Sequence, residues 1–203
     1  MGLQKVPIKY TKKGVTEKMR KIVFVDMDGV VARYERWAYR GRIIDDVREK
    51  EPIFTQKGSK FFRTCKPDLN AIRMVKGLNS INSLSVMVLS GVSSGEVGEE
   101  QIEDKSYWLK KNMHFLNETQ QLFTSGSKVA EACNFLGIRE LNKDLILIDD
   151  FNGNLLEWEK AGGVAIKYIN GVNSESSWNG LKVRSDSVVE DVVAIMDILG
   201  IVL

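Results

Sequence analysis

A short apolar run that ends in two aspartates and a glycine constrains this chain most. Residues 22–25 are all apolar, and Asp26, Met27, Asp28 and Gly29 follow directly. The run predicts a buried strand, and the glycine allows the chain to turn sharply after it. The two carboxylates are then expected close together, where they repel each other unless a cation or a proton intervenes. The pair indicates a divalent metal, two different protonation roles, or both.

The same Asp-x-Asp-Gly pattern occurs in calcium loops and in plain turns. An EF-hand needs further oxygen ligands and a distal glutamate at a fixed spacing. Residues 30–34 are Val-Val-Ala-Arg-Tyr, which excludes the calcium loop. A plain structural turn stays open on this segment alone.

Apolar runs and helical periodicity alternate along the rest of the chain. Strands are predicted at 84–89, 121–124, 145–148 and 161–168, and helices at 67–78, 102–113, 127–136 and 188–199. The helix 127–136 is expected to stop at Gly137, because glycine favours the position after a helix. This alternation predicts an α/β fold with a Rossmann-like parallel sheet and helices on both faces.

The 203 residues are enough for one well-buried α/β domain with a small insertion. Residues 1–20 are basic and poor in apolar groups, which predicts a solvated arm or, alternatively, an arm that attracts polyanions. Residues 21–203 are expected to form the core. Within them, residues 33–64 mix aromatic, basic and acidic side chains without clear periodicity, and we expect a small cap there, directly after the first strand.

The composition is that of a soluble globular protein, with 28% charged and 43% hydrophobic residues. A net charge of +2 does not by itself argue for a nucleic-acid partner. Cys65 and Cys133 lack metal-ligand spacing, so we expect free buried thiols in a reducing cytosol. No apolar run reaches the roughly 18–20 residues of a membrane span. We therefore expect a cytoplasmic protein without a membrane partner.

Polar residues follow three further predicted strands at the same edge of the sheet. They are Ser90 with Gly91, Lys128 at the start of a helix, and the pair Asp149 and Asp150. Each has a plainer interpretation: a turn serine, a solvated helix lysine, and a helix cap. Because the carboxyl ends of parallel strands meet at one edge, we expect these groups to lie near Asp26. Such a set can bind Mg²⁺ and a phosphate.

In this order, the motifs resemble those of the haloacid dehalogenase-like phosphohydrolase superfamily. The matching positions are Asp26-Met-Asp28-Gly, Ser90, Lys128, and Asp149-Asp150 with Asn154. The resemblance implies a Rossmann-like core in which the first aspartate is a nucleophile and the second an acid/base. The second aspartate marks phosphoryl transfer in this superfamily, since the true dehalogenases lack it.

The mechanism implied by the resemblance divides the work among these residues. Asp26 attacks the phosphorus of a phosphomonoester, and Asp28 protonates the leaving oxygen and later activates water. Mg²⁺ is expected on Asp26, the backbone carbonyl of Asp28 and Asp150, with Asp149 as a ligand or an orienting group. The remaining phosphoryl oxygens are expected on Ser90, Gly91 and Lys128.

A narrower resemblance is to the 5'(3')-deoxyribonucleotidases. It rests on residues 25–35, on Phe61-Phe62, on the helix from Pro67, and on residues 105–109. The chain departs from that family at Gly91, where Ser-Pro would follow the second motif, and in the helix that separates Lys128 from Asp149. The resemblance implies a nucleoside monophosphate substrate.

Aromatic residues of the cap bear on the choice of substrate. Trp37 and Tyr39 could stack on a nucleobase, whereas Phe61 and Phe62 are better explained as core residues that anchor the cap. Two alternatives remain open. One is a phosphatase for nucleic-acid 3' or 5' ends, which the basic arm and cap arginines suggest. The other is a phosphate-binding regulatory module without turnover.

Overall fold

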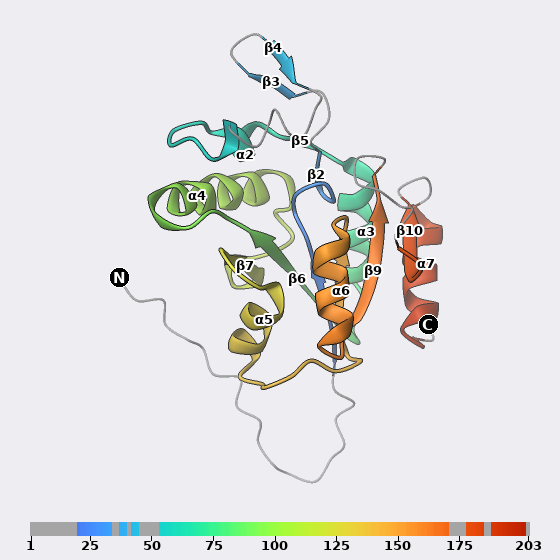
Figure 1. The fold of residues 1–203 in the computed structure, drawn as a ribbon. Helices are drawn as coiled ribbons and strands as arrows, with labels where there is room; N and C mark the ends of the chain where they lie inside the picture. The colour runs from blue at the N-terminus through green and yellow to red at the C-terminus, as the bar shows by residue number, and fades with distance from the viewer. Residues whose placement is uncertain are drawn as a thin grey trace.

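A six-stranded parallel sheet forms the centre of the computed structural model, which describes residues 20–33, 37–39, 42–44, 53–170, 178–184 and 188–201 (Figure 1). The strand order is β10-β9-β8-β1-β6-β7, and every neighbouring pair is parallel. The strands are β1 (Lys21–Val25), β6 (Leu84–Gly91), β7 (Gln121–Thr124), β8 (Leu145–Asp149), β9 (Val164–Ile169) and β10 (Leu181–Arg184). The predicted α/β fold with a parallel sheet is confirmed.

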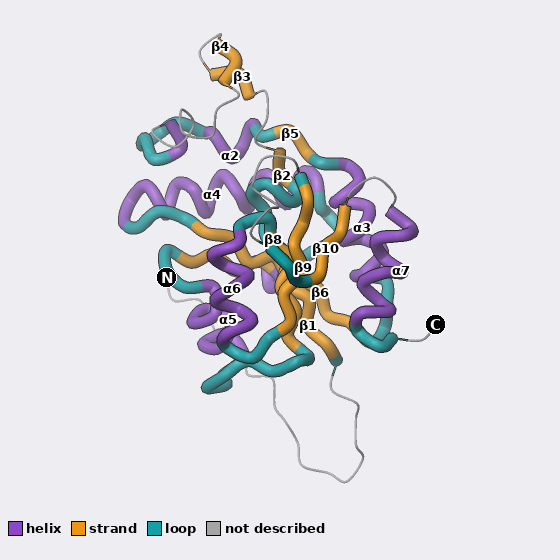
Figure 2. The backbone as a smooth tube through the Cα atoms, turned by 45° about the vertical axis from the view of Figure 1, so that its right-hand side comes forward, coloured by secondary structure: helices purple, strands orange, loops and turns teal. Residues whose placement is uncertain are grey.

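Helices cover both faces of the sheet (Figure 2). On one face lie α3 (Leu69–Asn79) and α7 (Val188–Ile198). On the other lie α5 (Lys128–Leu136) and α6 (Asn152–Lys160). The long helix α4 (Gly95–Asn112) and the short helix α2 (Phe61–Thr64) contact each other toward the end of the sheet to which the strands point.

Short antiparallel elements follow the first strand. A hairpin is formed by β3 (Trp37–Tyr39) and β4 (Arg42–Ile44). A second ladder pairs β2 (Ala32–Arg33) with β5 (Lys66–Pro67). A single 3-10 turn, η1 (Glu118–Gln120), precedes β7. A small cap-like insertion after β1 is therefore present, as the sequence predicted, although much of the range 33–64 lies outside the described residues.

The central strand is buried on both faces because its side chains alternate between two apolar cores. Val23 and Val25 of β1 face the core under α3 and α7, whereas Phe24 faces the core under α5 and α6. The ring of Phe24 packs edge-on against Trp158, with centroids 5.4 Å apart. This double burial explains the unbroken apolar run and sets the end of β1 deep in the molecule.

Two helix ends match the predictions because capping residues nearby in the sequence set them. The carboxylate of Asp68 accepts hydrogen bonds from the amides of Asn70 and Ala71, which caps the start of α3. Gly137 ends α5 in the left-handed conformation, with φ of 67°. Cys65 and Cys133 are buried and are not joined in a disulfide, as predicted.

Other elements were missed or misplaced. The helix α6 was not predicted, because its first turn is Asn-Gly-Asn, which has low helix propensity. The strand predicted at 161–168 starts three residues later, since Ala161 ends α6 and Gly162 turns the chain with φ of 99°. The helix predicted from 102 begins at Gly95, and β10 was not predicted.

Some predictions lie outside the described residues. They include the basic arm, apart from residue 20, and the side chains of Trp37 and Tyr39. The aromatic pair Phe61 and Phe62 is described, and both are buried core residues, as the plainer interpretation held. Among the described residues, no helix has the length and apolar character needed to cross a membrane.

Candidate active site

The site is set at the point where the strand order reverses. From β1 the chain moves to β6 and β7 on one side, and it then returns to β8 on the other side. A crevice forms beyond the strand ends at such a switch point in open α/β sheets. The register pairs Val25 with both Val88 of β6 and Ile148 of β8. Asp26 is therefore level with Asp149, and Ser90 lies only one residue further along its strand.

Asp26 is held by its own backbone surroundings. Its amide donates to the carbonyl of Ile148 at 2.9 Å, which extends the β1–β8 ladder by one residue. The amide of Met27 donates to Asp26 Oδ1 at 2.8 Å. Only 5% of the residue is exposed. A carboxylate fixed in this way at the end of a buried strand has one orientation available to it.

The turn after Asp26 needs glycine for two separate reasons. The carbonyl of Met27 accepts hydrogen bonds from the amides of Val31 and Ala32, so the chain folds back tightly. Gly29 has φ of 77°, a conformation that costs other residues free energy. A Cβ atom at Gly29 would also collide with the carboxylate of Asp150. The glycine therefore lets the second acidic segment approach the first.

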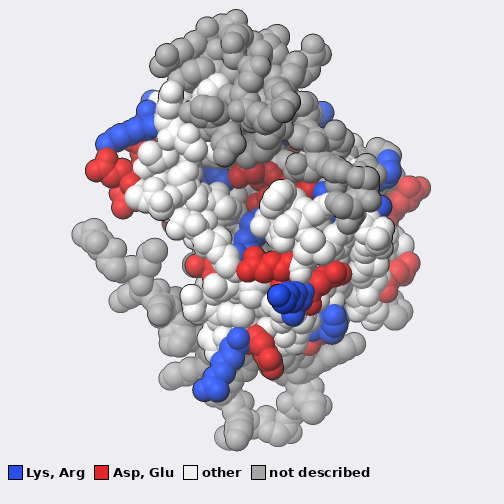
Figure 3. Space-filling view, viewed as in Figure 1, with Lys and Arg blue, Asp and Glu red and all other residues white. Residues whose placement is uncertain are grey.

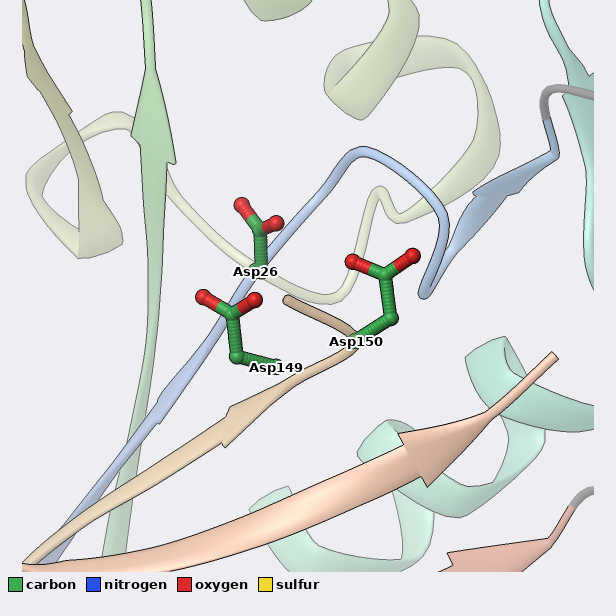
Figure 4. Close-up of side chains that lie close together, drawn as sticks. All are labelled: Asp26, Asp149 and Asp150. Carbon is green, nitrogen blue, oxygen red and sulfur yellow. The ribbon is translucent and has the colours of Figure 1, made fainter. Parts of the chain in front are cut away.

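Three buried carboxylates meet at this point. Asp26, Asp149 and Asp150 each offer one oxygen, and the three oxygens lie within 4.8 Å of one another. Figure 4 shows the three side chains rising from the ends of β1 and β8 toward the same space. Carboxylate oxygens in this number and spacing fit a small hard cation such as Mg²⁺, which keeps waters in its remaining positions. The donor set is thus suited to the metal that the sequence predicted.

Lys128 counters part of this negative charge. Its Nζ lies 2.8 Å from Asp26 Oδ1 and 2.7 Å from Asp149 Oδ2. The side chain starts at the first residue of α5, directly after the capping Ser127. Burial lowers the pKa of Lys128, but the attraction of Asp149 and Asp26 is larger and leaves its pKa above the usual value. The lysine is therefore a fixed positive charge between two carboxylates.

Burial has the opposite consequence for the pKa of Asp26, which it raises. In the absence of metal, the pKa of Asp26 is raised to about 8, mainly by burial, although Lys128 opposes the change. The neighbouring carboxylates of Asp149, Asp28 and Asp150 contribute to this rise. A bound cation favours the charged form for the same electrostatic reason. Metal binding and ionisation of Asp26 are thus expected to occur together.

Asp149 is oriented by groups of the following helix. Its Oδ1 accepts from the amide of Phe151 at 2.8 Å, and its Oδ2 accepts from Asn154 Nδ2 at 2.9 Å. The residue before the first turn of α6 is Phe151, which makes no side-chain cap bond. The plain helix-cap interpretation therefore does not describe the acidic pair. Instead, α6 supplies donors that fix Asp149.

Asp28 lies in a different environment from Asp26. Its Oδ2 forms a short ion pair with Lys105 Nζ and accepts from Ser90 Oγ at 3.2 Å. Lys105 also donates to Ser90 Oγ at 2.9 Å and to the carbonyl of Gly91 at 2.6 Å. The other oxygen of Asp28 is buried and has no hydrogen-bond partner among the described residues. A buried carboxylate oxygen without a partner suits a group that exchanges a proton with a ligand.

Lys105 is a site residue whose role the sequence did not predict, since the residue was noted only as part of a family pattern. The side chain is completely buried, and its ammonium lies 4.1 Å from the ring centroid of Phe62. A signal was present, because α4 places Gln101, Lys105 and Trp108 on one face, and all three are buried. A lysine on the buried face of a helix needs a partner of opposite charge.

The structure brings the predicted polar residues to one edge of the sheet. Lys128 contacts Asp26 and Asp149, while Ser90 contacts Asp28. Gly91 lies beside them, and its carbonyl holds Lys105. The plainer interpretations of Ser90 as a turn residue and of Lys128 as a solvated lysine do not fit, because both are buried.

Charge is unusually concentrated at this edge of the sheet. All the buried lysines of the described chain, Lys105, Lys128 and Lys167, have their ammonium groups here. With all four aspartates ionised, as expected when metal is bound, they outnumber the three lysines by one negative charge, and a divalent cation would leave one excess positive charge. On the face shown in Figure 3, acidic and basic side chains are interspersed.

Comparison by sequence finds no relative: no known family profile matches the chain, and no curated protein does. Comparison by structure does find similar proteins. A D,D-heptose 1,7-bisphosphate phosphatase from Burkholderia thailandensis is similar with a TM-score of 0.54 and 12% identity, covering 88% of this chain and 98% of that chain.

Two further solved structures carry the name of the expected superfamily. A haloacid dehalogenase-like hydrolase from Streptococcus pneumoniae has a TM-score of 0.55 and 10% identity over 87% of this chain and 99% of that one. A hydrolase of the same superfamily from Ehrlichia chaffeensis has a TM-score of 0.50 and 15% identity over 90% and 98%. Identity this low bears on architecture alone. The chain has the fold of the haloacid dehalogenase-like hydrolases.

Proposed function

We propose that this protein is a Mg²⁺-dependent phosphomonoester hydrolase that works through an aspartyl-phosphate on Asp26. The observation that carries the proposal is the division of the Asp-Met-Asp motif. Asp26 lies with two further carboxylates and Lys128, while Asp28 lies with Ser90 and Lys105. One aspartate thus has the surroundings of a metal-bound nucleophile, and the other has those of a proton-transfer group.

Asp26 is suited to attack on phosphorus. Its carboxylate is held by the amide of Met27 and by Lys128, so it is oriented before substrate arrives. Attack forms a bond from a carboxylate oxygen to phosphorus and breaks the bond to the leaving oxygen. Orientation of this kind removes part of the entropic barrier to the reaction. Lys128 keeps its charge throughout and offsets the negative charge that gathers on the phosphoryl oxygens.

Asp28 is suited to transfer a proton in both halves of the reaction. It would give its proton to the leaving oxygen and then take one from the water that attacks the aspartyl-phosphate. Ser90 and Lys105 hold one oxygen of Asp28, which leaves the other oxygen for the proton. Ser90 Oγ and the backbone at Gly91 would hold a phosphoryl oxygen.

The metal would be held by Asp26, Asp149 and Asp150, with the backbone carbonyl of Asp28 as the proposed fourth protein ligand. When bound, Mg²⁺ supplies charge neutralisation that allows a carboxylate to approach an anionic phosphate. Lys128 and Asn154 both contact Oδ2 of Asp149, which holds this carboxylate beside the other two.

Hydrolysis of an aryl phosphate tests the reaction class. Turnover of para-nitrophenyl phosphate should require Mg²⁺ and stop with EDTA. Neutral hydroxylamine should release inorganic phosphate from protein that has been quenched with acid during turnover, because it cleaves the acyl bond of an aspartyl-phosphate. Metal-independent turnover, or turnover that survives Asp26→Asn, would contradict the mechanism. A folded protein that binds metal and phosphate without turnover would support the regulatory module instead.

For the substrate, we propose a nucleoside monophosphate, on the basis of the narrower sequence resemblance and one cavity. This cavity, of 330 Å³, is bordered by Phe54, Phe62 and polar residues of α4. The ring of Phe62 borders this cavity and also lies 4.1 Å from the ammonium of Lys105, the partner of Asp28. Most of the lining is charged or polar, and the two aromatic rings could contact a base while the polar groups contact a sugar.

A substrate panel tests this choice. Deoxynucleoside monophosphates, sugar phosphates and oligonucleotides with a 3'-phosphate should be compared at equal concentration by kcat/KM. The nucleotides are expected to be hydrolysed best. A preference for the oligonucleotides would favour the nucleic-acid-end phosphatase, and a preference for sugar phosphates would refute the nucleotidase proposal while leaving the reaction class intact.

A further inference from the structure

Two polar side chains, one on β9 and one directly after it, contact the segments that carry the proposed metal ligands. The proposed chemistry uses neither of them. They are Lys167, which is 1% exposed, and Asn170, which directly follows the strand. We call this pair the β9 clamp. Its contacts fall on the backbone and side-chain groups that place Asp150.

Asn170 joins two segments that lie far apart in sequence. Its Nδ2 donates to Asp150 Oδ2 at 2.6 Å and to the carbonyl of Gly29 at 2.7 Å. In the sheet, β9 is separated from β1 by β8. The side chain therefore reaches past the end of β8 to the turn that follows the nucleophile. One amide group holds the Asp150 carboxylate against the Asp26–Gly29 turn.

The close approach of the Asp150 carboxylate to the turn at Gly29 depends on both Gly29 and Asn170. A Cβ atom at Gly29 would collide with the carboxylate of Asp150 and would come within 3.0 Å of Asn170 Nδ2. The glycine thus opens the space, and the amide fills it with a donor. Neither residue alone explains why the carboxylate lies there.

Lys167 holds the same segment from its backbone. Its Nζ donates to the carbonyl of Asp150 in a short hydrogen bond and to Asn152 Oδ1 at 2.7 Å. In the register of the sheet, Lys167 is paired with Asp149. The ammonium group therefore fixes the peptide that joins Asp150 to Phe151, while Asn170 fixes the carboxylate of Asp150.

We propose that Asn170 is a positioning residue, which holds Asp150 in the place where three carboxylates can share one cation. Carboxylates that repel one another separate unless other groups restrain them. A restraint that is present before the ion arrives lowers the cost of organising the site on binding. Outer partners of metal ligands typically contribute about 10- to 100-fold in affinity. The inference rests on the proposed metal-dependent function but concerns binding alone.

Manganese binding tests the role of Asn170 without an assay of activity. Mn²⁺ is titrated into the protein, and the free ion is followed by its electron paramagnetic resonance signal. Asp150→Asn identifies the binding event at this site. Asn170→Ala and Asn170→Leu remove both donors, and the leucine keeps most of the packing volume. Asn179→Ala makes the same change at an exposed residue and serves as the control.

Asn170→Ala and Asn170→Leu should both weaken Mn²⁺ binding by about tenfold or more, whereas Asn179→Ala should bind like the original protein. A folded Asn170→Leu variant, judged by circular dichroism, that binds Mn²⁺ within twofold of the original protein overturns the proposal. Absence of Mn²⁺ binding by the original protein also overturns it. If metal binds with the expected differences but no phosphomonoester is hydrolysed, the proposed function fails and the role of Asn170 stands.

Discussion

The two aspartates of the Asp26-Met-Asp28 motif are two residues apart, yet they lie in contrasting halves of the site. Asp26 belongs to what we call the metal half, the proposed metal site, which also contains Asp149 and Asp150. Asp28 belongs to what we call the proton-transfer half after its proposed role, and this half also contains Ser90 and Lys105. The carboxylates of the metal half follow the adjacent strands β1 and β8. The proton-transfer half also needs Lys105 from α4, the helix that follows β6.

The difference shows how one motif can supply two kinds of chemistry. Each aspartate has a buried lysine of its own: Lys128 from α5 for Asp26, and Lys105 from α4 for Asp28. In the metal half, Lys128 is shared with a second carboxylate, whereas in the other half Lys105 is shared with a hydroxyl and a carbonyl. The metal half therefore has surplus negative charge for a cation, and the proton-transfer half does not.

The largest effect is expected from Asp26→Asn. The change removes the proposed nucleophile, so kcat should fall by more than about 10³-fold, measured with an aryl phosphate at saturating Mg²⁺. Asp28→Asn should be nearly as damaging, because it keeps the proposed nucleophile but removes the proposed proton donor. If either variant keeps its normal turnover, the assignment of roles to the two halves is wrong.

Asp26→Asn should also change how the free energy of unfolding depends on pH. In metal-free protein the pKa of Asp26 is about 8 when folded and close to its ordinary value of 3.8 when unfolded. The unfolded chain then loses its proton first, so the stability contributed by this group falls as pH rises from about 4 to about 8. Asp26→Asn should lose less stability across that window, as measured by urea unfolding in EDTA. Equal slopes for the two proteins would contradict the raised pKa.

The two lysines offer a direct comparison of the halves. Lys128→Met leaves two buried carboxylates without their cation, which should cost about 3–5 kcal/mol in the free energy of unfolding. Lys105→Met should cost less, because Asp28 keeps Ser90 and its side chain is 14% exposed. Both should lower kcat by about 10²–10³-fold. Chemical unfolding at pH 7 checks the order, and an equal cost for both would show that the halves do not differ.

Alanine substitutions at Gly29 and Gly58 can separate the cost of backbone strain from the cost of a steric clash with Asp150. Gly29 and Gly58 both have positive φ, at 77° and 72°, but a Cβ atom meets Asp150 only at Gly29. Gly58→Ala should cost about 1 kcal/mol in unfolding free energy. Gly29→Ala should cost at least about 2 kcal/mol more and weaken Mn²⁺ binding. Similar stability losses and unchanged Mn²⁺ affinity would remove the steric role of Gly29.

The smallest effect is expected from Ser90→Ala in the proton-transfer half. The hydroxyl contacts Asp28 at 3.2 Å, while Lys105 keeps its other contacts. Stability should fall by about 1 kcal/mol, and kcat should fall more than KM rises if the hydroxyl supports the transition state. A rise in KM alone would make Ser90 a substrate-binding residue only.

Local patterns were sufficient for much of the fold and for the acidic residues. The apolar run before Asp26 and the one before Asp149 predicted buried strands, and parallel strands bring their carboxyl ends to one edge. A missed helix, α6, did not disturb this prediction, because the strand before it was still recognised. Its omission did hide Asn154 and Phe151 as the donors that orient Asp149.

Residues that support the site were harder to predict. Lys105, Lys167 and Asn170 belong to no acidic motif, and lysine and asparagine are common on solvated surfaces. Their function follows from burial and from contacts across 77, 17 and 141 residues. Such contacts depend on which strands become neighbours. Periodicity along the chain does not contain that information.

The positions of the strand ends that carry Asp26, Ser90 and Asp149 follow from the order of residues alone, because hydrophobic runs and turn residues act locally. The partners of these charged groups follow only from the packing of helices and strands. This packing places Lys128 beside Asp26, Lys105 beside Asp28, and Asn170 beside Asp150. The physical reason is burial: inside the protein each charge or amide must find a partner, and the packing of helices on the sheet chooses which one.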